Sequence, residues 1–339
     1  MTLKALRKFG IAALVSTGLY AAGPAFAQTN DYQAQFDTTL GTEMRAPQTF
    51  EAVYQNAFEQ RIAELADGSR GRIGVAAVDL STGQRIAVLG DQRFPMASTS
   101  KIAIAATFLD GVEKGRWSLT SEFPLLLPRR SARFSSKVAP VYEGQHMPAV
   151  DLIEIMITRS SNPATDALLR VVGGPEEVNA WMRRAGIRQF SLDRDIATLV
   201  RDDGEFDPAN HVDPRDSVTP NAMIELLTGL YQGKYLEPES RRVLLGAMSR
   251  TRTGKRRIPA LMPAGVKVSH KTGSLNNTSS DVGILEMPDG RAVALAVYVT
   301  GQGTRLNREA KIAQIARAIH DGYAAQKSRN YAGATYGGK

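Results

Sequence analysis

The order of secondary-structure patterns along the chain limits its fold more than any other feature. Short apolar runs typical of strands lie near both ends, at 73–78, 85–89, 267–270, 279–287 and 292–299. The middle of the chain, from about residue 98 to residue 248, carries mainly helical patterns. We therefore predict an α/β fold with an all-α part: an antiparallel sheet flanked by terminal helices, built from both ends of the chain, with a helical domain inserted into it.

The predicted domain boundaries follow from these patterns. Residues 47–93 and 262–326 form the split α/β domain, residues 94–261 form the helical domain, and residues 327–339 form a disordered tail. Helices are expected at 49–65, 101–113, 149–159, 164–172, 175–185, 220–231 and 309–324.

The first residues have the pattern of a removable export signal. Lys4, Arg7 and Lys8 precede an apolar run, and Ala25-Phe26-Ala27 supplies small residues for cleavage before Gln28. The apolar run is short for a membrane span. We expect residues 1–27 to be a signal peptide and residues 28–46 a loose leader. The mature protein is then periplasmic or secreted and has no stable membrane anchor.

Composition narrows the chemistry further. The chain has no cysteine, and its four histidines do not fall at metal-ligand spacing, so we expect neither a metal nor a cofactor. Loss of the three basic residues of 1–27 lowers the formal net charge from +8 to about +5. The densest basic stretch, 250–257, has no interleaved aromatic residues, which argues against a nucleic-acid partner.

Three short strings carry the candidate chemistry. In Ser98-Thr99-Ser100-Lys101, a helix would place a hydroxyl and an amine on one face, one turn apart. Such a serine is a nucleophile with its own base if burial or a nearby cation lowers the pKa of the lysine. The other two strings are Ser160-Ser161-Asn162 and Lys271-Thr272-Gly273-Ser274. Read alone, Ser98 could simply cap a helix, and Ser160-Ser161-Asn162 could be an ordinary polar cap.

Taken together and in this order, the strings resemble those of the class A serine β-lactamases. The similar segments are Phe94 to Lys101, Ser160-x-Asn162, Gly173-Gly174-Pro175 and Lys271-Thr272-Gly273, and the likeness extends from about residue 50 to 322. His270 before the last string is similar to the extended-spectrum branch. The resemblance implies a β-lactamase/penicillin-binding-protein-like fold and a small-molecule β-lactam substrate.

The resemblance also implies a role for each matching residue. Ser98 would be the nucleophile and Lys101 its base, and Ser160 would pass a proton to the lactam nitrogen. Asn162, Lys271 and Thr272 would bind the substrate, Gly273 would let the strand approach it, and the N–H groups of Ser98 and Ser274 would form the oxyanion hole. Arg257 falls where some relatives place an arginine that binds the substrate carboxylate, although a solvated arginine is an equal alternative. Ser161 departs from the usual Asp, which supports the loop.

One part of the family pattern is missing. The loop that begins at Leu192 and ends at Pro220, which we call the omega loop, has Ile196 where the family places the Glu that activates water for deacylation, and Val200 where it places Asn. Arg194 and Asp216 are expected to pair at the neck of the loop. Either Glu205 or Asp203 in the longer loop replaces the missing base, or no residue does and the acyl-enzyme persists.

We therefore predict a periplasmic serine β-lactamase, a hydrolase that opens cyclic amides through an acyl-enzyme and confers antibiotic resistance. The alternative is a penicillin-binding acyl acceptor with slow turnover, or a peptidoglycan-peptide hydrolase, that lacks an efficient deacylation base. A third hypothesis, a binding protein without catalysis, is disfavoured by the intact set of Ser98, Lys101, Ser160 and Lys271. We expect a monomer.

Overall fold

The computed structural model describes residues 56–335, with side chains described up to residue 325. The predicted signal peptide 1–27, the leader 28–46 and the start of the first predicted helix lie outside the described residues.

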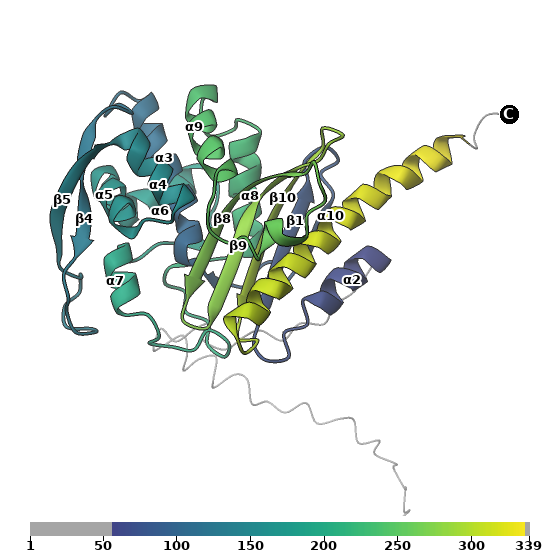
Figure 1. The fold of residues 1–339 in the computed structure, drawn as a ribbon, viewed down its shortest axis with the longest axis horizontal. Coiled ribbons are helices and arrows are strands. Elements are labelled where there is room, and N and C mark those ends of the chain that lie inside the picture. The colour runs from purple at the N-terminus through teal and green to yellow at the C-terminus, as the bar shows by residue number, and fades with distance from the viewer. Residues whose placement is uncertain (1–55, 336–339) are drawn as a thin grey trace, which may run out of the picture. The chain divides into compact units, whose positions relative to one another are not determined.

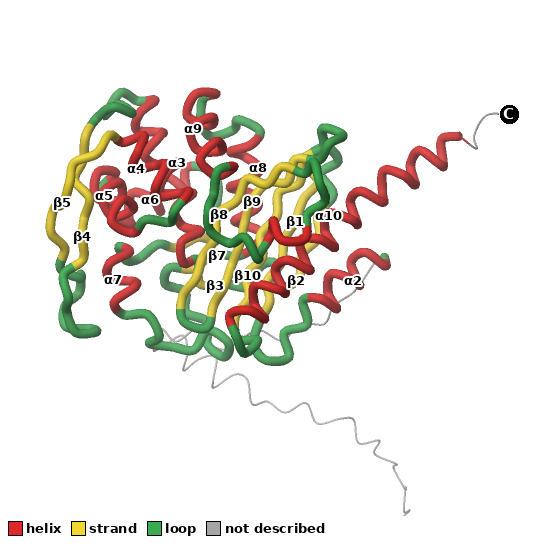
Figure 2. Tube along the Cα trace, viewed as in Figure 1, coloured by secondary structure: helices red, strands yellow, loops and turns green. Residues whose placement is uncertain are grey.

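A five-stranded antiparallel sheet lies at the centre of the fold, with strand order β2-β1-β10-β9-β8 (Figures 1 and 2). Its strands are β1 (Ile73–Asp79), β2 (Arg85–Val88), β8 (Lys267–Leu275), β9 (Thr278–Glu286) and β10 (Ala292–Thr300). The first and last predicted strands are neighbours, with Ile73 opposite Val299. The sheet is therefore assembled from both ends of the chain, as the sequence predicts.

Side chains of the central strands alternate between two apolar cores. In β1, Val75 and Ala77 belong to the core beneath the terminal helices, whereas Ala76 and Val78 belong to the core shared with the helical part. The first face is covered by α2 (Ala57–Leu65) and α10 (Arg305–Thr335) (Figure 1). Because both faces are covered, β10 is buried at every position. This explains why the strands read as continuous apolar runs.

The helical part surrounds α3 (Lys101–Glu113), whose first nine residues are all buried. The other helices are α4 (Ala149–Thr158), α5 (Asn162–Val172), α6 (Pro175–Arg184), α7 (Ile196–Arg201), α8 (Pro220–Tyr231) and α9 (Pro238–Ser249), with short 3-10 turns η1 (Ala97–Ser100) and η2 (Ile258–Leu261). A small sheet of β3 (Phe94–Pro95), β7 (Ser217–Val218) and β6 (Phe190–Ser191) ties the omega loop to the segment before Ser98.

The middle of the chain is less uniformly helical than predicted. A hairpin of β4 (Glu122–Pro128) and β5 (Val141–Pro148) lies within it and packs against α5 (Figure 2). Its strands are mostly half-buried or exposed and contain one buried residue, so their sequence lacks the apolar alternation by which strands are recognised. Helices α7 and α9 were also not predicted.

At the other end, α10 begins at Arg305 and continues to Thr335, whereas the predicted helix spans 309–324 and the predicted tail begins at residue 327. The division into two domains at residues 93 and 262 stays a prediction. Across residues 56–335, no helix has both the length and the apolar character needed to cross a membrane.

Candidate active site

Ser98 lies on the 3-10 turn that leads into α3. The three other residues of this turn are buried, and Ser98 is only partly so. Ala97 has φ +48°, a left-handed conformation that is costly for a residue with a Cβ atom, so the turn is strained at the residue before the serine. The carbonyl of Ser98 accepts the N–H of Lys101, which places the two residues one turn apart on the same helix start. The nucleophile candidate is thus presented at the beginning of a buried helix.

Lys101 is fully buried, and its amine contacts the loop between α4 and α5. Its Nζ donates to the carbonyl oxygen of Ser160 at 2.8 Å, to Ser160 Oγ at 3.2 Å and to Asn162 Oδ1 at 2.7 Å. These contacts join the first predicted string to the second. A surface lysine, whose amine would reach water, is excluded by this geometry.

The third string reaches the same hydroxyl from the sheet. Lys271 on β8 is also fully buried, and its Nζ donates to Ser160 Oγ at 2.9 Å and to the carbonyl of Thr272 at 2.9 Å. Ser160 Oγ therefore lies between two lysine amines that are far apart in the sequence. Ser160 itself has φ +59°, so the loop holds it in a strained conformation between α4 and α5.

Burial makes both amines unusually weak bases for lysine. Desolvation, followed by the positive charge of Lys271, holds the pKa of Lys101 well below its usual value, while Asp166 acts in the opposite direction. Desolvation lowers the pKa of Lys271 to about 7, with Asp281 opposing and Arg257 adding to this shift. Near neutral pH, the amine of Lys271 can therefore lose a proton and accept one again, as a base must, and the pKa of Lys101 is shifted in the same direction.

Gly273 allows β8 to lie against the turn that carries Ser98. A Cβ atom at this position would lie 2.7 Å from the carbonyl oxygen of Met96 and 3.1 Å from Ala97 Cβ. Only glycine permits so close an approach. The next residue, Ser274, is exposed, and the side chain of Thr272 hydrogen-bonds to Thr253 at 2.7 Å. Strand β8 thus brings its predicted binding residues beside the serine turn.

Arg257 is buried, whereas one of its two predicted readings was a solvated arginine. Its side chain is 1% exposed and donates to the carbonyl oxygens of Gly273 and Ser280 and to Ser274 Oγ, at 2.8, 2.7 and 2.7 Å. It also forms an ion pair with Glu309 at 3.2 Å. The guanidinium is therefore occupied beneath the strand, where it fixes the hydroxyl of Ser274. The reading of Arg257 as a solvated arginine is wrong.

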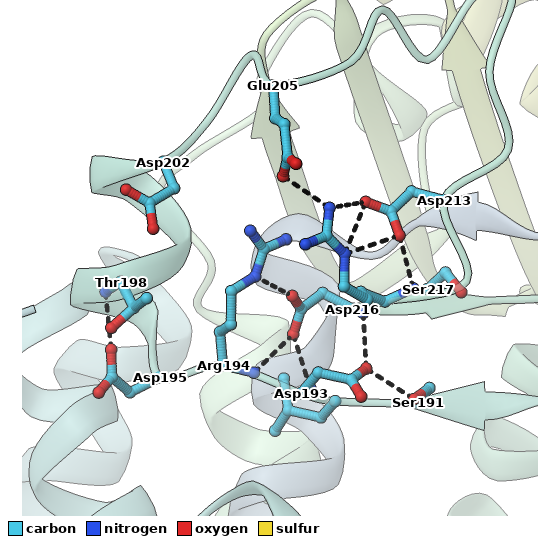
Figure 3. A network of polar contacts seen from close by, with 12 residues as sticks. Ser191, Asp193, Arg194, Asp195, Thr198, Asp202, Glu205, Asp213, Asp216 and Ser217 are labelled. Carbon is cyan, nitrogen blue, oxygen red and sulfur yellow. Dashed lines mark hydrogen bonds and ion pairs between the residues drawn. The ribbon is translucent and has the colours of Figure 1, made fainter. Parts of the chain in front are cut away.

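The omega loop forms a dense ionic network of its own (Figure 3). Arg194 Nε and Asp216 Oδ2 are 2.6 Å apart, which confirms the predicted pair at the neck of the loop. The carboxylates of Glu205 and Asp213 both bind the guanidinium of Arg215 at 2.6 Å (Figure 3). Asp203 accepts the backbone N–H of Asn276 at 2.7 Å, at the turn between β8 and β9. The two predicted replacement bases, Glu205 and Asp203, thus bind other parts of the loop and the neighbouring turn.

A buried carboxylate that the sequence reasoning missed lies on α5. Asp166 is 4% exposed, and its two oxygens accept the N–H groups of Ile196 and Ala197 at 2.7 and 2.9 Å. It therefore anchors the start of α7, where Ile196 is buried in place of the family Glu. Desolvation raises the pKa of Asp166 to about 7. Its position four residues after Asn162, on the same helix face, was the signal that could have found it.

Within residues 56–335, no cluster of three or more histidine, aspartate or glutamate side chains is arranged to hold a metal ion. The polar groups of the site are the partly buried hydroxyl of Ser98 and the hydroxyl of Ser160, which lies between the buried amines of Lys101 and Lys271. The side-chain amide of Asn162 accepts a hydrogen bond from Lys101. Such a set of groups is typical of a serine acyl-transfer site.

Comparison with known proteins agrees with this class. The model of the beta-lactamase enzyme family matches residues 57–323. Beta-lactamase CTX-M-8 of Citrobacter amalonaticus is 31% identical over 79% of this chain and 90% of its own length. Extended-spectrum beta-lactamase PER-1 of Pseudomonas aeruginosa is 27% identical over 77% of this chain and 86% of its own length.

Solved structures agree as well. A beta-lactamase from Chitinophaga pinensis has a TM-score of 0.69 and 30% identity, and covers 79% of this chain and 100% of its own. A variant of the class A beta-lactamase of the last common ancestor of Gram-negative bacteria has a TM-score of 0.67 and 34% identity, and covers 80% of this chain and 100% of its own. The chain belongs to the beta-lactamase enzyme family, and its relatives are the class A enzymes.

Proposed function

We propose that the protein hydrolyses β-lactams in two stages, through an ester formed on Ser98. The observation that carries this proposal is the hydroxyl of Ser160 held between the buried amines of Lys101 and Lys271. Membership of the family supports the substrate class, because the relatives are beta-lactamases. The enzyme is a serine β-lactamase.

In the first stage, the neutral amine of Lys101 takes the proton of Ser98, and the serine oxygen attacks the lactam carbonyl. The N–H groups of Ser98 and Ser274 stabilise the negative charge that develops on the carbonyl oxygen. A donor of this kind typically contributes about 3–4 kcal/mol to the transition state. Ser160 then donates its proton to the lactam nitrogen as the ring opens, and the Lys101 ammonium returns the first proton to Ser160.

The residues around the hydroxyl of Ser160 are proposed to bind the substrate. The amine of Lys271 and the hydroxyls of Thr272 and Ser274 can donate hydrogen bonds to the substrate carboxylate. Because Asn162 Oδ1 accepts from Lys101, its Nδ2 keeps its donors for the side-chain amide of the substrate. Arg257 contributes by holding Ser274, to whose Oγ it donates at 2.7 Å.

The location and partners of the protein are part of the same proposal. The charged start, apolar run and cleavage pattern of residues 1–27 support export to the periplasm or beyond, with cleavage after Ala27. The mature protein then acts as a monomer on a small molecule, without a stable membrane anchor and without nucleic acid.

The ionic network of the omega loop favours one alternative function. Glu205 and Asp203 are both held by other groups, so the ester could be hydrolysed slowly and the protein would act as a penicillin-binding acyl acceptor. The two functions share the first stage and differ only in the lifetime of the ester.

Time-resolved electrospray mass spectrometry of the mature protein with benzylpenicillin tests the proposal. A covalent adduct that forms and then disappears with release of the hydrolysed drug supports the β-lactamase, whereas a persistent adduct supports the acceptor. Ser98→Ala should abolish the adduct. An adduct of unchanged mass on this variant would refute Ser98 as the nucleophile.

A further inference from the structure

Every carboxylate of the omega loop is bound by another group of the protein. The loop contains eight of them: Asp193, Asp195, Asp202, Asp203, Glu205, Asp207, Asp213 and Asp216. The partners are arginines of the loop, backbone N–H groups, Ser191 and Asn277, and Figure 3 shows the contacts of Asp193, Asp195, Glu205, Asp213 and Asp216. The position of the family base is taken by Ile196, whose side chain is 2% exposed and cannot accept a proton.

Two amines that can accept a proton contact the hydroxyl of Ser160 instead. Ser160 Oγ is 3.2 Å from Lys101 Nζ and 2.9 Å from Lys271 Nζ. A hydroxyl in contact with a neutral amine can pass its own proton to that amine while it takes one from water. Because two lysine amines contact Ser160 Oγ, either can accept the proton of this hydroxyl.

We propose that Ser160, together with Lys101 and Lys271, is the base that activates water for hydrolysis of the ester, in place of an omega-loop carboxylate. This inference rests on the proposed function and deepens it, because it assigns the second stage as well as the first to the same hydroxyl.

The proposed step balances as follows. Water loses a proton to Ser160 Oγ, Ser160 loses its own proton to a neutral lysine amine, and the water oxygen bonds to the ester carbonyl carbon. In the collapse of this tetrahedral intermediate, the bond from the carbonyl carbon to Ser98 Oγ breaks. The lysine ammonium then returns its proton, through Ser160, to Ser98 Oγ. The product is a carboxylic acid, and both serines and the amine are restored.

Several charges around the amines set the pH at which this base works. Lys101 faces Lys271 and Asp166, and Lys271 faces Asp281 and Arg257. Because a protonated amine cannot accept a proton, the hydrolysis rate should fall as pH decreases through the pKa of the amine pair. Burial places the pKa of Lys271 at about 7. An exposed carboxylate base would instead remain active down to a pH of about 4–5.

The test isolates the second stage. The benzylpenicillin adduct is formed at high drug concentration, freed of drug by rapid desalting, and followed by mass spectrometry as it decays at pH values from 5 to 9. The variants are Ser160→Ala, Glu205→Gln and Asp203→Asn. Ser161→Ala is the matched control, since Ser161 is the adjacent hydroxyl and accepts only the N–H of Ala164 at 3.4 Å.

The expected result is that Ser160→Ala slows decay of the adduct by about 100-fold or more, as loss of a general base does. Glu205→Gln, Asp203→Asn and Ser161→Ala should decay within about twofold of the wild-type rate, because none of these groups takes part in the step. The wild-type decay rate should decrease about tenfold per pH unit below neutrality.

Three results would overturn the inference. The Ser160→Ala adduct could decay as fast as the wild-type adduct, or slow decay could be confined to Glu205→Gln or Asp203→Asn. The third result is a decay rate of the wild-type adduct that stays constant from pH 5 to 9. If Ser160→Ala forms no adduct, the pH profile of the wild-type protein still decides. A wild-type adduct that never decays refutes this inference and leaves acylation standing, whereas absence of any adduct refutes the proposed function itself.

Discussion

At the scale of single residues, the site depends on positions that tolerate few alternatives. Lys101 and Lys271 are both fully buried, and each lowers its cost of burial by contacts with Ser160. Gly273 has no room for a side chain. These local constraints explain why the predicted reacting groups lie in short strings of fixed residue types.

Lys271→Gln should shift the pH dependence of acylation. The positive charge of Lys271 lowers the pKa of Lys101, so its removal raises that pKa. Because only the neutral amine accepts the proton of Ser98, the acid limb of the acylation rate should move to higher pH. Stopped-flow measurement of nitrocefin acylation between pH 5 and 9 checks this. A limb at unchanged or lower pH would contradict the coupling between the two amines.

Gly273→Ala should damage both stability and acylation. Its Cβ would lie 2.4 Å from Ser280 Oγ and 2.7 Å from the carbonyl oxygen of Met96, so the strand must shift from the serine turn. We expect a loss of about 1–3 kcal/mol in the free energy of unfolding, typical of overpacking. Urea denaturation measures it. The control Gly246→Ala meets only the flexible end of Arg250 at 3.3 Å and should not be destabilised.

At the scale of elements, the contact between α5 and α7 carries a titratable group. Asp166 on α5 binds the first two N–H groups of α7 and so fixes the omega loop. The loop is also fastened near its middle by Asp203 and Asp207, which bind Asn276 and Asn277. The loop is thus held near its start and near its middle by carboxylates.

Asp166 should make stability depend on pH. Burial raises its pKa from 3.8 to about 7, so the folded protein holds this proton more tightly than the unfolded chain. The corresponding stability is complete below about pH 4 and is lost as pH rises through about 7. Asp166→Asn should lack this decrease. Urea denaturation from pH 4.5 to 8 tests it, with exposed Asp151→Asn as control; parallel curves for wild type and Asp166→Asn would contradict it.

The sequence predicted the elements that obey a simple period and missed those that do not. The strands of the main sheet and α3 could be predicted because their buried residues form apolar runs in the sequence. The hairpin from Glu122 to Pro148 contains prolines and exposed strands, so no alternation marks it. One of the two readings of Arg257, a solvated arginine, came from the basic run that it ends, and only the packed sheet reveals that it turns inward. The partners of Glu205 and Asp203 depend on how a long loop folds back, which no local pattern records.

At the scale of the whole molecule, Arg257 connects the parts. It binds strands β8 and β9 through the carbonyls of Gly273 and Ser280, and binds α10 through Glu309. The predicted substrate-binding strand is therefore joined to the terminal helix by one buried guanidinium.

Arg257→Met should be strongly destabilising, because it leaves the carbonyl oxygens of Gly273 and Ser280 without their guanidinium donor and Glu309 with Arg305 as its remaining partner. Removal of one partner of a buried pair typically costs about 3–5 kcal/mol. Thermal and urea denaturation give the measurement. The control Arg242→Met removes an exposed pair with Glu239, whose side chains are 72% and 75% exposed, and should change stability by less than about 1 kcal/mol. Equal effects of the two substitutions would show that Arg257 is not a structural link.

The pairing of β1 with β10 also governs when this protein can become reactive. A chain that crosses a membrane from its amino end delivers its nucleophile early, while the strand bearing the second amine arrives about 170 residues later. Until that strand has entered the sheet, Ser160 lacks its contact with Lys271, and the oxyanion donor proposed on β8 is absent. Under the proposed export, the chain therefore stays inactive until its last third has emerged and folded.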